Sequence, residues 1–424
     1  MREEVLRRRL RYVLLRLLFI FSILGPGFIT ANVDNDAGGI YTYASAGAQF
    51  GYSLLWTMIP VAITLTFAQE IAARMGAITG KGLSELVREQ YGFRFTFLLM
   101  CGLVLCNFCD VLSEFAGVAS SMQLFNISKF VSVPIAAAVV WSLVVLGDYK
   151  KLEKVFVFLS FLYIAYIVTA VLAKPDWLLA ARHIVRMPTL GELKNSDYLY
   201  LSVGIIGATI APWQQFYLQA SVVERGAGPK ELKYSQADAV VGSLFSVLVA
   251  GFIVIACAAT LFVHGFYHIK DATDAAQSLK PLGGEYAFIL FSVGLLNASL
   301  FAASILPLST AYTVCEALGF ESGLNKRFRQ APTFYWLYTG LIVIGAAAVL
   351  LPNVPLIKVA VFSQVLNGMM LPIVLVVILL LVSNSEIMGE HKNSRLYSAV
   401  TWFITALITA LTVYMLYTQW RHPS

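Results

Sequence analysis

The stretch that decides the fold of this chain is Gly25-Pro26-Gly27-Phe28-Ile29-Thr30-Ala31-Asn32-Val33-Asp34-Asn35-Asp36-Ala37-Gly38-Gly39. It places two carboxylates, Asp34 and Asp36, inside a long apolar run. A carboxylate near the bilayer centre costs about 2.5–3.5 kcal/mol on insertion scales, so it normally faces a cavity, a counter-ion or a substrate. Ala37, Gly38 and Gly39 follow directly, and we expect the helix to open over 36–39 and to free backbone carbonyls as ligands. The stretch predicts a cation site inside a membrane.

The composition of the whole chain also indicates an integral membrane protein. Of its 424 residues, 58% are hydrophobic and only 13% are charged, whereas soluble domains are about a quarter charged. Windows of about twenty apolar residues predict eleven spans, centred near positions 30, 63, 108, 139, 162, 210, 250, 302, 342, 369 and 407. This leaves no room for a separate soluble domain, so we expect one membrane transport domain over 1–424.

The distribution of basic residues predicts the orientation of the spans. Of the 30 Lys and Arg residues, 21 lie in the N-terminal stretch and in alternate loops, which are therefore predicted to be cytoplasmic. Because the formal charge of +6 is spread over short loops between spans, it does not indicate nucleic-acid binding. We expect a cytoplasmic stretch over 1–17, a multi-pass location in the plasma (inner) membrane, and a retained N-terminus.

The sixth predicted span is interrupted as well. It contains Pro212 and two glycines, Gly204 and Gly207, among apolar residues. A proline removes an intrahelical hydrogen bond and exposes a carbonyl of the preceding turn. Spans one and six hold matching positions in a five-plus-five inverted repeat, and interruptions at matching positions indicate the central site of a transporter.

These observations predict an all-α integral membrane protein of about 11 transmembrane helices, with helices 1 and 6 broken. We expect a first repeat over 18–175, a second repeat over 198–383 and an eleventh helix over 396–418.

Polar residues at membrane depth form several groups. The first break supplies Asn32, Asp34, Asn35 and Asp36. The second break supplies Thr209, Gln214, Gln215 and the carbonyls freed around Ala208 to Pro212. The alternative interpretations are a polar vestibule lining for the first group and an ordinary proline kink for the second.

Two further polar stripes lie in the third and tenth spans. The third span carries Asn107, Asp110 and Glu114, whose spacings of three and four put them on one helical face. Such a stripe suits an ion or proton path, a vestibule or a buried support network. In the tenth span Ser363, Gln364 and Asn367 also share a face, which suits either a ligand role or hydrogen bonding between helices.

The remaining chemistry argues against catalysis. None of the five histidines lies within a predicted span, which disfavours a histidine proton relay in the membrane. No Ser/His, metal–His or cofactor motif is present in the sequence, so we expect neither an enzyme nor a bound cofactor.

Several motifs resemble the Nramp family of divalent-metal transporters. In the first two spans they are Gly25-Pro26-Gly27-Phe28, Ala46-Gly47-Ala48, Gly51-Tyr52-Ser53-Leu54-Leu55-Trp56 and Thr79-Gly80-Lys81-Gly82-Leu83-Ser84-Glu85-Leu86. In the sixth and tenth spans they are Gly207-Ala208-Thr209 and Ser363-Gln364-Val365. The resemblance covers the ten core spans in order. It implies the inverted-repeat fold of the leucine-transporter type and alternating access.

The chain departs from the family pattern at both breaks. The family's Asp-Pro-Gly-Asn reads Asp36-Ala37-Gly38-Gly39 here, which keeps the acid and loses the Asn ligand. Its Met-Pro-His reads Ala211-Pro212-Trp213, which loses the thioether and the histidine linked to proton movement, and its carbonyl ligand maps to Ala208. A thioether favours soft metals, whereas carboxylate, carbonyl and water suit Mg²⁺, Ca²⁺ and Mn²⁺. Mg²⁺ usually keeps several waters, and a roomier site made of oxygen ligands fits such a partly hydrated ion. In this respect the chain resembles the Nramp-related magnesium transporter branch.

The resulting hypothesis is uptake of Mg²⁺, with Mn²⁺ as a second substrate, without proton coupling. The predicted metal-site residues are Asp36, Ala208, Gln215, Gln214, Gly39 and Ala211. The predicted cavity or support residues are Asp34, Asn35, Thr209, Gln364, Asp110 and Glu114. The expected partners are the metal ion and the lipid bilayer, with no obligate protein partner. The alternatives are a proton-coupled Mn²⁺/Fe²⁺ symporter, a sodium-coupled amino-acid transporter of the same fold, and a metal sensor without transport.

Overall fold

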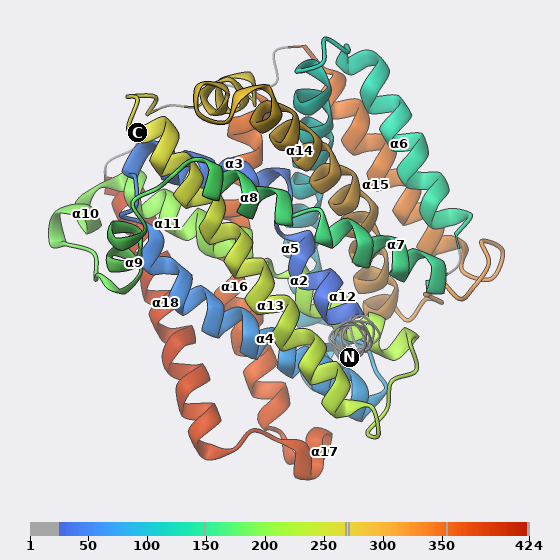
Figure 1. Cartoon of the computed structure of the whole chain (residues 1–424). Coiled ribbons are helices and arrows are strands. Elements are labelled where there is room, and N and C mark those ends of the chain that lie inside the picture. The colour runs from blue at the N-terminus through green and yellow to red at the C-terminus, as the bar shows by residue number, and fades with distance from the viewer. Residues whose placement is uncertain (1–24, 148, 268, 270–271, 353–354, 422–424) are drawn as a thin grey trace, which may run out of the picture.

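The computed structural model describes residues 25–421 except 148, 268, 270–271 and 353–354, and every regular element in this part of the chain is a helix (Figure 1). The helices of the first half are α2 (Pro26–Val33), α3 (Ala37–Phe50), η1 (Leu55–Thr57), α4 (Met58–Thr79), α5 (Leu83–Gln123), α6 (Lys129–Val145), α7 (Tyr149–Phe161), α8 (Ile164–Leu172), α9 (Trp177–Val185) and α10 (Leu190–Lys194). Those of the second half are α11 (Ser196–Thr209), α12 (Trp213–Glu224), α13 (Leu232–Cys257), η2 (Ala258–Phe262), α14 (Ala272–Leu318), α15 (Pro332–Leu350), α16 (Leu356–Ser383), α17 (Ser385–Met388), η3 (Gly389–His391) and α18 (Arg395–Arg421). The predicted cytoplasmic stretch over 1–17 lies outside the described residues.

The described helices account for the eleven predicted spans. Within the described part of the chain, eight helical segments are long and apolar enough to cross a membrane: Leu55–Thr79, Leu83–Gln123, Leu152–Leu172, Leu232–Phe262, Phe291–Leu318, Pro332–Leu350, Leu356–Ser383 and Arg395–Arg421. A shorter apolar helix, α6, lies between the second and third of these. The remaining two spans are the broken pairs α2–α3 and α11–α12, whose halves are each too short to cross alone.

The first break lies slightly earlier than predicted. Helix α2 ends at Val33 and α3 begins at Ala37, so residues 34–36 form the open turn. Asp36 is the N-cap of α3, and its Oδ1 accepts a hydrogen bond from the Gly39 N–H at 2.6 Å. The expectation that the helix opens over 36–39 is therefore wrong. An aspartate satisfies the free N–H groups of a helix start, so the helix resumes immediately after it.

The second break is centred where the sequence predicted it. Helix α11 ends at Thr209 and α12 begins at Trp213. Ile210, with φ −132° and ψ 67°, leaves the helical conformation. Pro212 then follows without a backbone N–H, so the chain restarts a helix only after it.

Helices α11 and α16 pack with their backbones in contact. A Cβ atom placed on Gly207 would lie 2.0 Å from the Gln364 carbonyl oxygen, and one on Gly368 would lie 2.5 Å from the Val203 carbonyl oxygen. Both separations are shorter than any real Cβ contact. Only glycine fits at these two crossings, which is the usual device for close helix packing in membranes.

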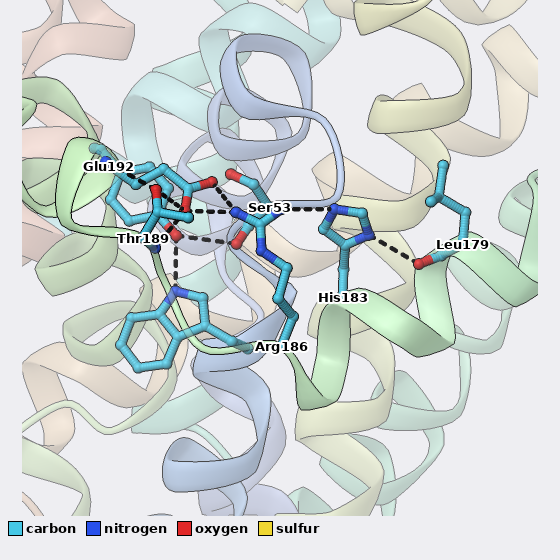
Figure 2. A network of polar contacts seen from close by, with 8 residues as sticks. Ser53, Leu179, His183, Arg186, Thr189 and Glu192 are labelled. Atoms are coloured by element: carbon cyan, nitrogen blue, oxygen red, sulfur yellow. Dashed lines mark hydrogen bonds and ion pairs between the residues drawn. The ribbon is translucent and has the colours of Figure 1, made fainter.

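The connection between α8 and α11 is held by a polar network at one end of the bundle, where Figure 1 places α9 and α10, away from α17. In Figure 2, Arg186 Nη2 donates to both oxygens of Glu192, at 2.5 and 2.6 Å, while Arg186 Nη1 lies 3.2 Å from Nε2 of His183. Burial raises the pKa of Glu192, but hydrogen bonds from Thr189 and Arg186 outweigh this and lower that pKa below its ordinary value. The network therefore fixes a charged hairpin outside the spans.

A second set of hydrogen bonds joins the start of α11 to the turn after α3. The indole N–H of Trp56 donates to the Tyr198 hydroxyl at 2.8 Å, and that hydroxyl donates to the Ser53 carbonyl at 3.0 Å. The two broken spans are thereby connected at this end of the molecule.

Candidate functional site

Asp36 lies buried at the first break and faces the tenth-span helix α16. The amide nitrogen of Gln364 lies 3.4 Å from each of its carboxylate oxygens. Gly38 permits this approach, because a Cβ atom there would meet that nitrogen at 2.2 Å. The structure thus brings together two predicted site residues that are 328 positions apart in the sequence.

Three further oxygens at the first break are buried and accept no hydrogen bond from the described residues. They are Oδ1 of Asn32, Oδ1 of Asp34 and Oδ1 of Asn35. The amide nitrogens of both asparagines are satisfied, by the Phe28 carbonyl and by Ser246 of α13 respectively. Buried polar atoms almost always have a partner, so these oxygens are suited to accept from water or to contact a cation.

The other oxygen of Asp34 connects the two breaks. Its Oδ2 accepts a hydrogen bond from the backbone N–H of Ala211 at 2.9 Å. This N–H belongs to the open turn between α11 and α12 and has no helical partner. Asp34 therefore stabilises the geometry of the second break, a more specific role than the vestibule lining considered from the sequence.

The Ala208 carbonyl, the predicted backbone ligand, is held by a residue that sequence reasoning missed. The Tyr43 hydroxyl donates to it at 3.1 Å and lies 2.8 Å from Oγ1 of Thr209. A carbonyl oxygen has two lone pairs, so one remains for an ion. Tyr43 stands seven positions after Asp36, which puts both on one face of α3, and this spacing was the available signal.

The two glutamines after Pro212 make contacts within the protein. Gln214 accepts from Nε2 of Gln69 at 3.1 Å, and its own Nε2 lies 3.4 Å from the Thr30 carbonyl. With its amide nitrogen turned toward them, Gln215 donates to the carbonyls of Ala211 and Pro212 at 3.2 and 3.0 Å. As metal ligands Gln214, Gln215 and Ala211 stay predictions. The N–H of Gly39, another predicted metal residue, donates to Asp36 instead.

The acidic residues of α5 reach the first break and α16, as their shared face requires. Oε2 of Glu114 accepts from the N–H of Ala37 at 3.2 Å. The Asn367 amide donates to both oxygens of Asp110, at 3.0 and 2.9 Å, and lies 3.4 Å from Oε1 of Gln364. A polar chain therefore runs from Asp36 through α16 to α5.

A second residue missed by sequence reasoning, Asp238 of α13, holds the start of α2. Its carboxylate accepts from the backbone N–H groups of Gly25, Gly27 and Phe28, at 2.9, 2.7 and 3.1 Å. A Cβ atom on Gly27 would lie 2.6 Å from the Ala239 nitrogen, so the glycine is needed for this contact. A lone acid near the start of an apolar span was the signal in the sequence. A carboxylate is favourable there because helix N-termini carry partial positive charge.

No group of three or more His, Cys, Asp or Glu side chains among the described residues is arranged to hold a metal ion. An ion at Asp36 would therefore be held by a mixed set of carboxylate, carbonyl and amide oxygens, completed by water. Such a set suits hard divalent cations.

Comparisons with known proteins agree on one family and fold. The family model Nramp, natural resistance-associated macrophage protein-like, matches residues 27–418. The divalent metal cation transporter MntH of Aeromonas hydrophila is 27% identical over 416 residues, covering 94% of this chain and 96% of that protein. MntH of Deinococcus radiodurans is 28% identical over 409 residues, covering 94% and 90%.

Solved structures show the same architecture. The Eremococcus coleocola manganese transporter, in complex with an aromatic bis-isothiourea substituted compound, superposes with a TM-score of 0.73 at 22% identity, covering 92% of this chain and 84% of that chain. MhsT in complex with L-phenylalanine gives a TM-score of 0.62 at 12% identity, covering 92% and 97%. The predicted leucine-transporter-like inverted repeat with broken helices 1 and 6 is confirmed.

Proposed function

The chain belongs to the Nramp family, and we propose on this premise that it moves a divalent metal cation, Mg²⁺ with Mn²⁺ as a second substrate, across the plasma membrane by alternating access. The observation that carries this proposal is the buried Asp36 carboxylate at the first break, a segment that also contains three buried oxygens without a hydrogen-bond partner among the described residues. The relatives named as divalent metal cation transporters support the class of substrate.

The preference for Mg²⁺ rests on the oxygen character of the site. Ala211 occupies the second break and is almost fully buried, so no soft sulfur ligand comes from this position. Mg²⁺ dehydrates reluctantly and usually binds through one or two carboxylates while keeping several waters. Asp36 would supply the charge, and the Ala208 carbonyl and neighbouring amides would contact the ion directly or through water.

Uptake without proton coupling is energetically sufficient in this proposal. Moving two positive charges inward down a membrane potential supplies about 4.6 kcal/mol per 100 mV. Trp213 stands where the resemblance places the family's proton-linked histidine, and an indole side chain does not titrate. Downhill uptake therefore needs no second ion.

We further propose a cytoplasmic N-terminus, with repeats over 18–175 and 198–383 followed by the eleventh helix over 396–418. The Asp238 contacts support this orientation, because they put the start of α2 and the start of α13 on one side of the membrane. The charge distribution predicts both of these ends to be cytoplasmic.

The test is metal flux into proteoliposomes, with Mg²⁺, Mn²⁺ and Ca²⁺ supplied separately and the internal pH followed by a trapped dye. We expect potential-driven uptake of Mg²⁺ and Mn²⁺ at unchanged internal pH. Acidification that follows the metal would overturn the uncoupled mechanism. Uptake of Mn²⁺ without any uptake of Mg²⁺ would overturn the substrate preference.

A further inference from the structure

An apolar groove lies on the surface between α5 and α14, away from the polar site. Its volume is about 420 Å³. Apart from Thr96, its lining consists of apolar side chains and a cysteine, among them Phe93, Phe97, Met100, Cys101, Val104 and Leu318. In a membrane-spanning region such a surface faces lipid tails.

The groove runs from one membrane surface through the depth of one leaflet. Gly92, with φ +78°, interrupts α5, so the span itself begins at Phe93. The lining continues to Phe108, a rise of about 22 Å at 1.5 Å per residue, whereas one leaflet's hydrocarbon is about 15 Å thick. A helix of that length and about 10 Å diameter would occupy roughly 1,700 Å³, so the groove fits a single extended chain better than a helix.

Two arginines, Arg88 and Arg94, belong to the part of α5 at the end of the groove nearest the membrane surface. Arg94 is exposed, follows the lining residue Phe93, and makes no hydrogen bond or ion pair with the described residues. Arg88 donates to the carbonyl of Ala317, itself a lining residue, at 3.1 Å. The nearby carboxylate of Glu89 is paired with Lys81 at 2.5 Å and does not neutralise either arginine.

We propose that this groove binds one phospholipid with an anionic head group, with one of its two acyl chains lying along α5 and its phosphate lying between Arg88 and Arg94. Guanidinium groups match phosphate oxygens in charge and geometry. Each basic residue near the membrane surface favours an anionic lipid by a factor of about five. On the proposed topology this lipid belongs to the cytoplasmic leaflet. The site is separate from Asp36, so it stands or falls independently of the transported ion.

Cys101 provides a direct reporter, because it lines the groove and is exposed, whereas Cys109 is half-buried and Cys106, Cys257 and Cys315 are buried. The experiment uses the full chain carrying Cys109→Ser, in nanodiscs of phosphatidylcholine with or without phosphatidylglycerol. The rate of Cys101 modification by N-ethylmaleimide is measured in each. We expect phosphatidylglycerol to slow the modification at least fivefold, and Arg94→Gln to reduce this protection about fivefold.

The matched control is Arg329→Gln, which removes another exposed arginine from the α14–α15 connection and should leave the protection unchanged. A second variant, Val104→Trp, fills the groove with Arg94 intact and should abolish retention of phosphatidylglycerol in native mass spectrometry. Equal protection by both lipids, or full protection in Arg94→Gln, would overturn the proposal. Protection that rises with protein concentration would assign the groove to a second copy of the chain and overturn it as well.

Discussion

The two helix breaks present different chemical groups, side-chain oxygens at the first and backbone groups at the second. At the first break, residues 34–36 and the end of α2, the chain presents side-chain oxygens from Asn32, Asp34, Asn35 and Asp36. At the second break, residues 210–212 and the end of α11, it presents two backbone groups, the Ala208 carbonyl and the Ala211 N–H. Tyr43 and Asp34 of the first broken span hold these groups in place. The first break supplies charge and the second supplies shape. Substitutions at the first should therefore act through chemistry, and those at the second through geometry and size.

The largest effect is expected at Asp36. Asp36→Asn keeps an oxygen that can accept from the Gly39 N–H, since asparagine is also a good N-cap, but it removes the charge. We expect Mg²⁺ flux in proteoliposomes to fall about 100-fold or more, because loss even of groups that only support a metal ligand costs 10- to 100-fold.

The matched control for Asp36 is Asp176→Asn. Asp176 is also an N-cap, accepting from the Leu179 N–H at 2.9 Å in α9, away from both breaks, and its substitution should leave flux unchanged. Unchanged flux in Asp36→Asn would show that Asp36 acts only as a cap and would remove it from the metal site.

A smaller effect is expected at Asp34, the residue that joins the breaks. Asp34→Ala leaves the buried Ala211 N–H without an acceptor, at a cost of about 2 kcal/mol, which corresponds to a roughly thirtyfold loss of flux if the second break opens. Asp34→Asn retains an acceptor and should lose much less. Flux assays and thermal unfolding in detergent would measure both variants. An equal loss in the two would make Asp34 a second charged ligand.

The second break is expected to control which metal is preferred. Ala211→Met would introduce a soft ligand, and we expect the ratio of Cd²⁺ to Mg²⁺ uptake to rise about tenfold, or 1.4 kcal/mol. Because added volume in a packed site is itself disruptive, Ala211→Leu serves as the control of similar size without sulfur. A rise of the same size with leucine would assign the change to shape. No rise with methionine would argue that a soft site already exists, as in a Mn²⁺/Fe²⁺ symporter.

The smallest effect is expected at Tyr43. Tyr43→Phe removes one neutral hydrogen bond to the Ala208 carbonyl, worth about 1 kcal/mol. The KM for Mg²⁺ should change by no more than about fivefold, with kcat nearly unchanged. Complete loss of transport in this variant would mean that the hydroxyl itself contacts the ion. The second break would then act through chemistry as well as through geometry.

The sequence predicted the parts of this arrangement that depend on single residues. Pro212 and the buried acids located both breaks, and the spacing of Asp110 and Glu114 placed them on one face of α5. The predicted start of α3 was wrong because Asp36 was interpreted as the point where the helix opens. An aspartate instead caps the free N–H groups at the start of a helix, so α3 begins directly after it.

Contacts between distant segments could not be predicted in this way. The bond from the Ala211 N–H to Asp34 joins positions 177 apart, and Asp238 reaches Gly25 across 213 positions. Local sequence patterns do not indicate which residues of two distant segments will meet. That pairing is set by how the helices pack in three dimensions. The polar residues of the breaks were therefore identified, whereas their partners, and the supporting residues Tyr43 and Asp238, were not.

At Gly207 and Gly368 the backbones of α11 and α16 are in direct contact, so neither helix has room to slide along the other. The backbone carbonyl of Gln364 contacts Gly207, and its side-chain amide lies close to the Asp36 carboxylate. One residue therefore links the contact between α11 and α16 to Asp36. Because the contact leaves no room for sliding, we expect the two helices to move together, with the non-helical residues 210–212 as the hinge. A methyl group at position 207 would force α11 and α16 apart. We expect their joint movement to be lost, although none of the predicted metal-site residues is changed.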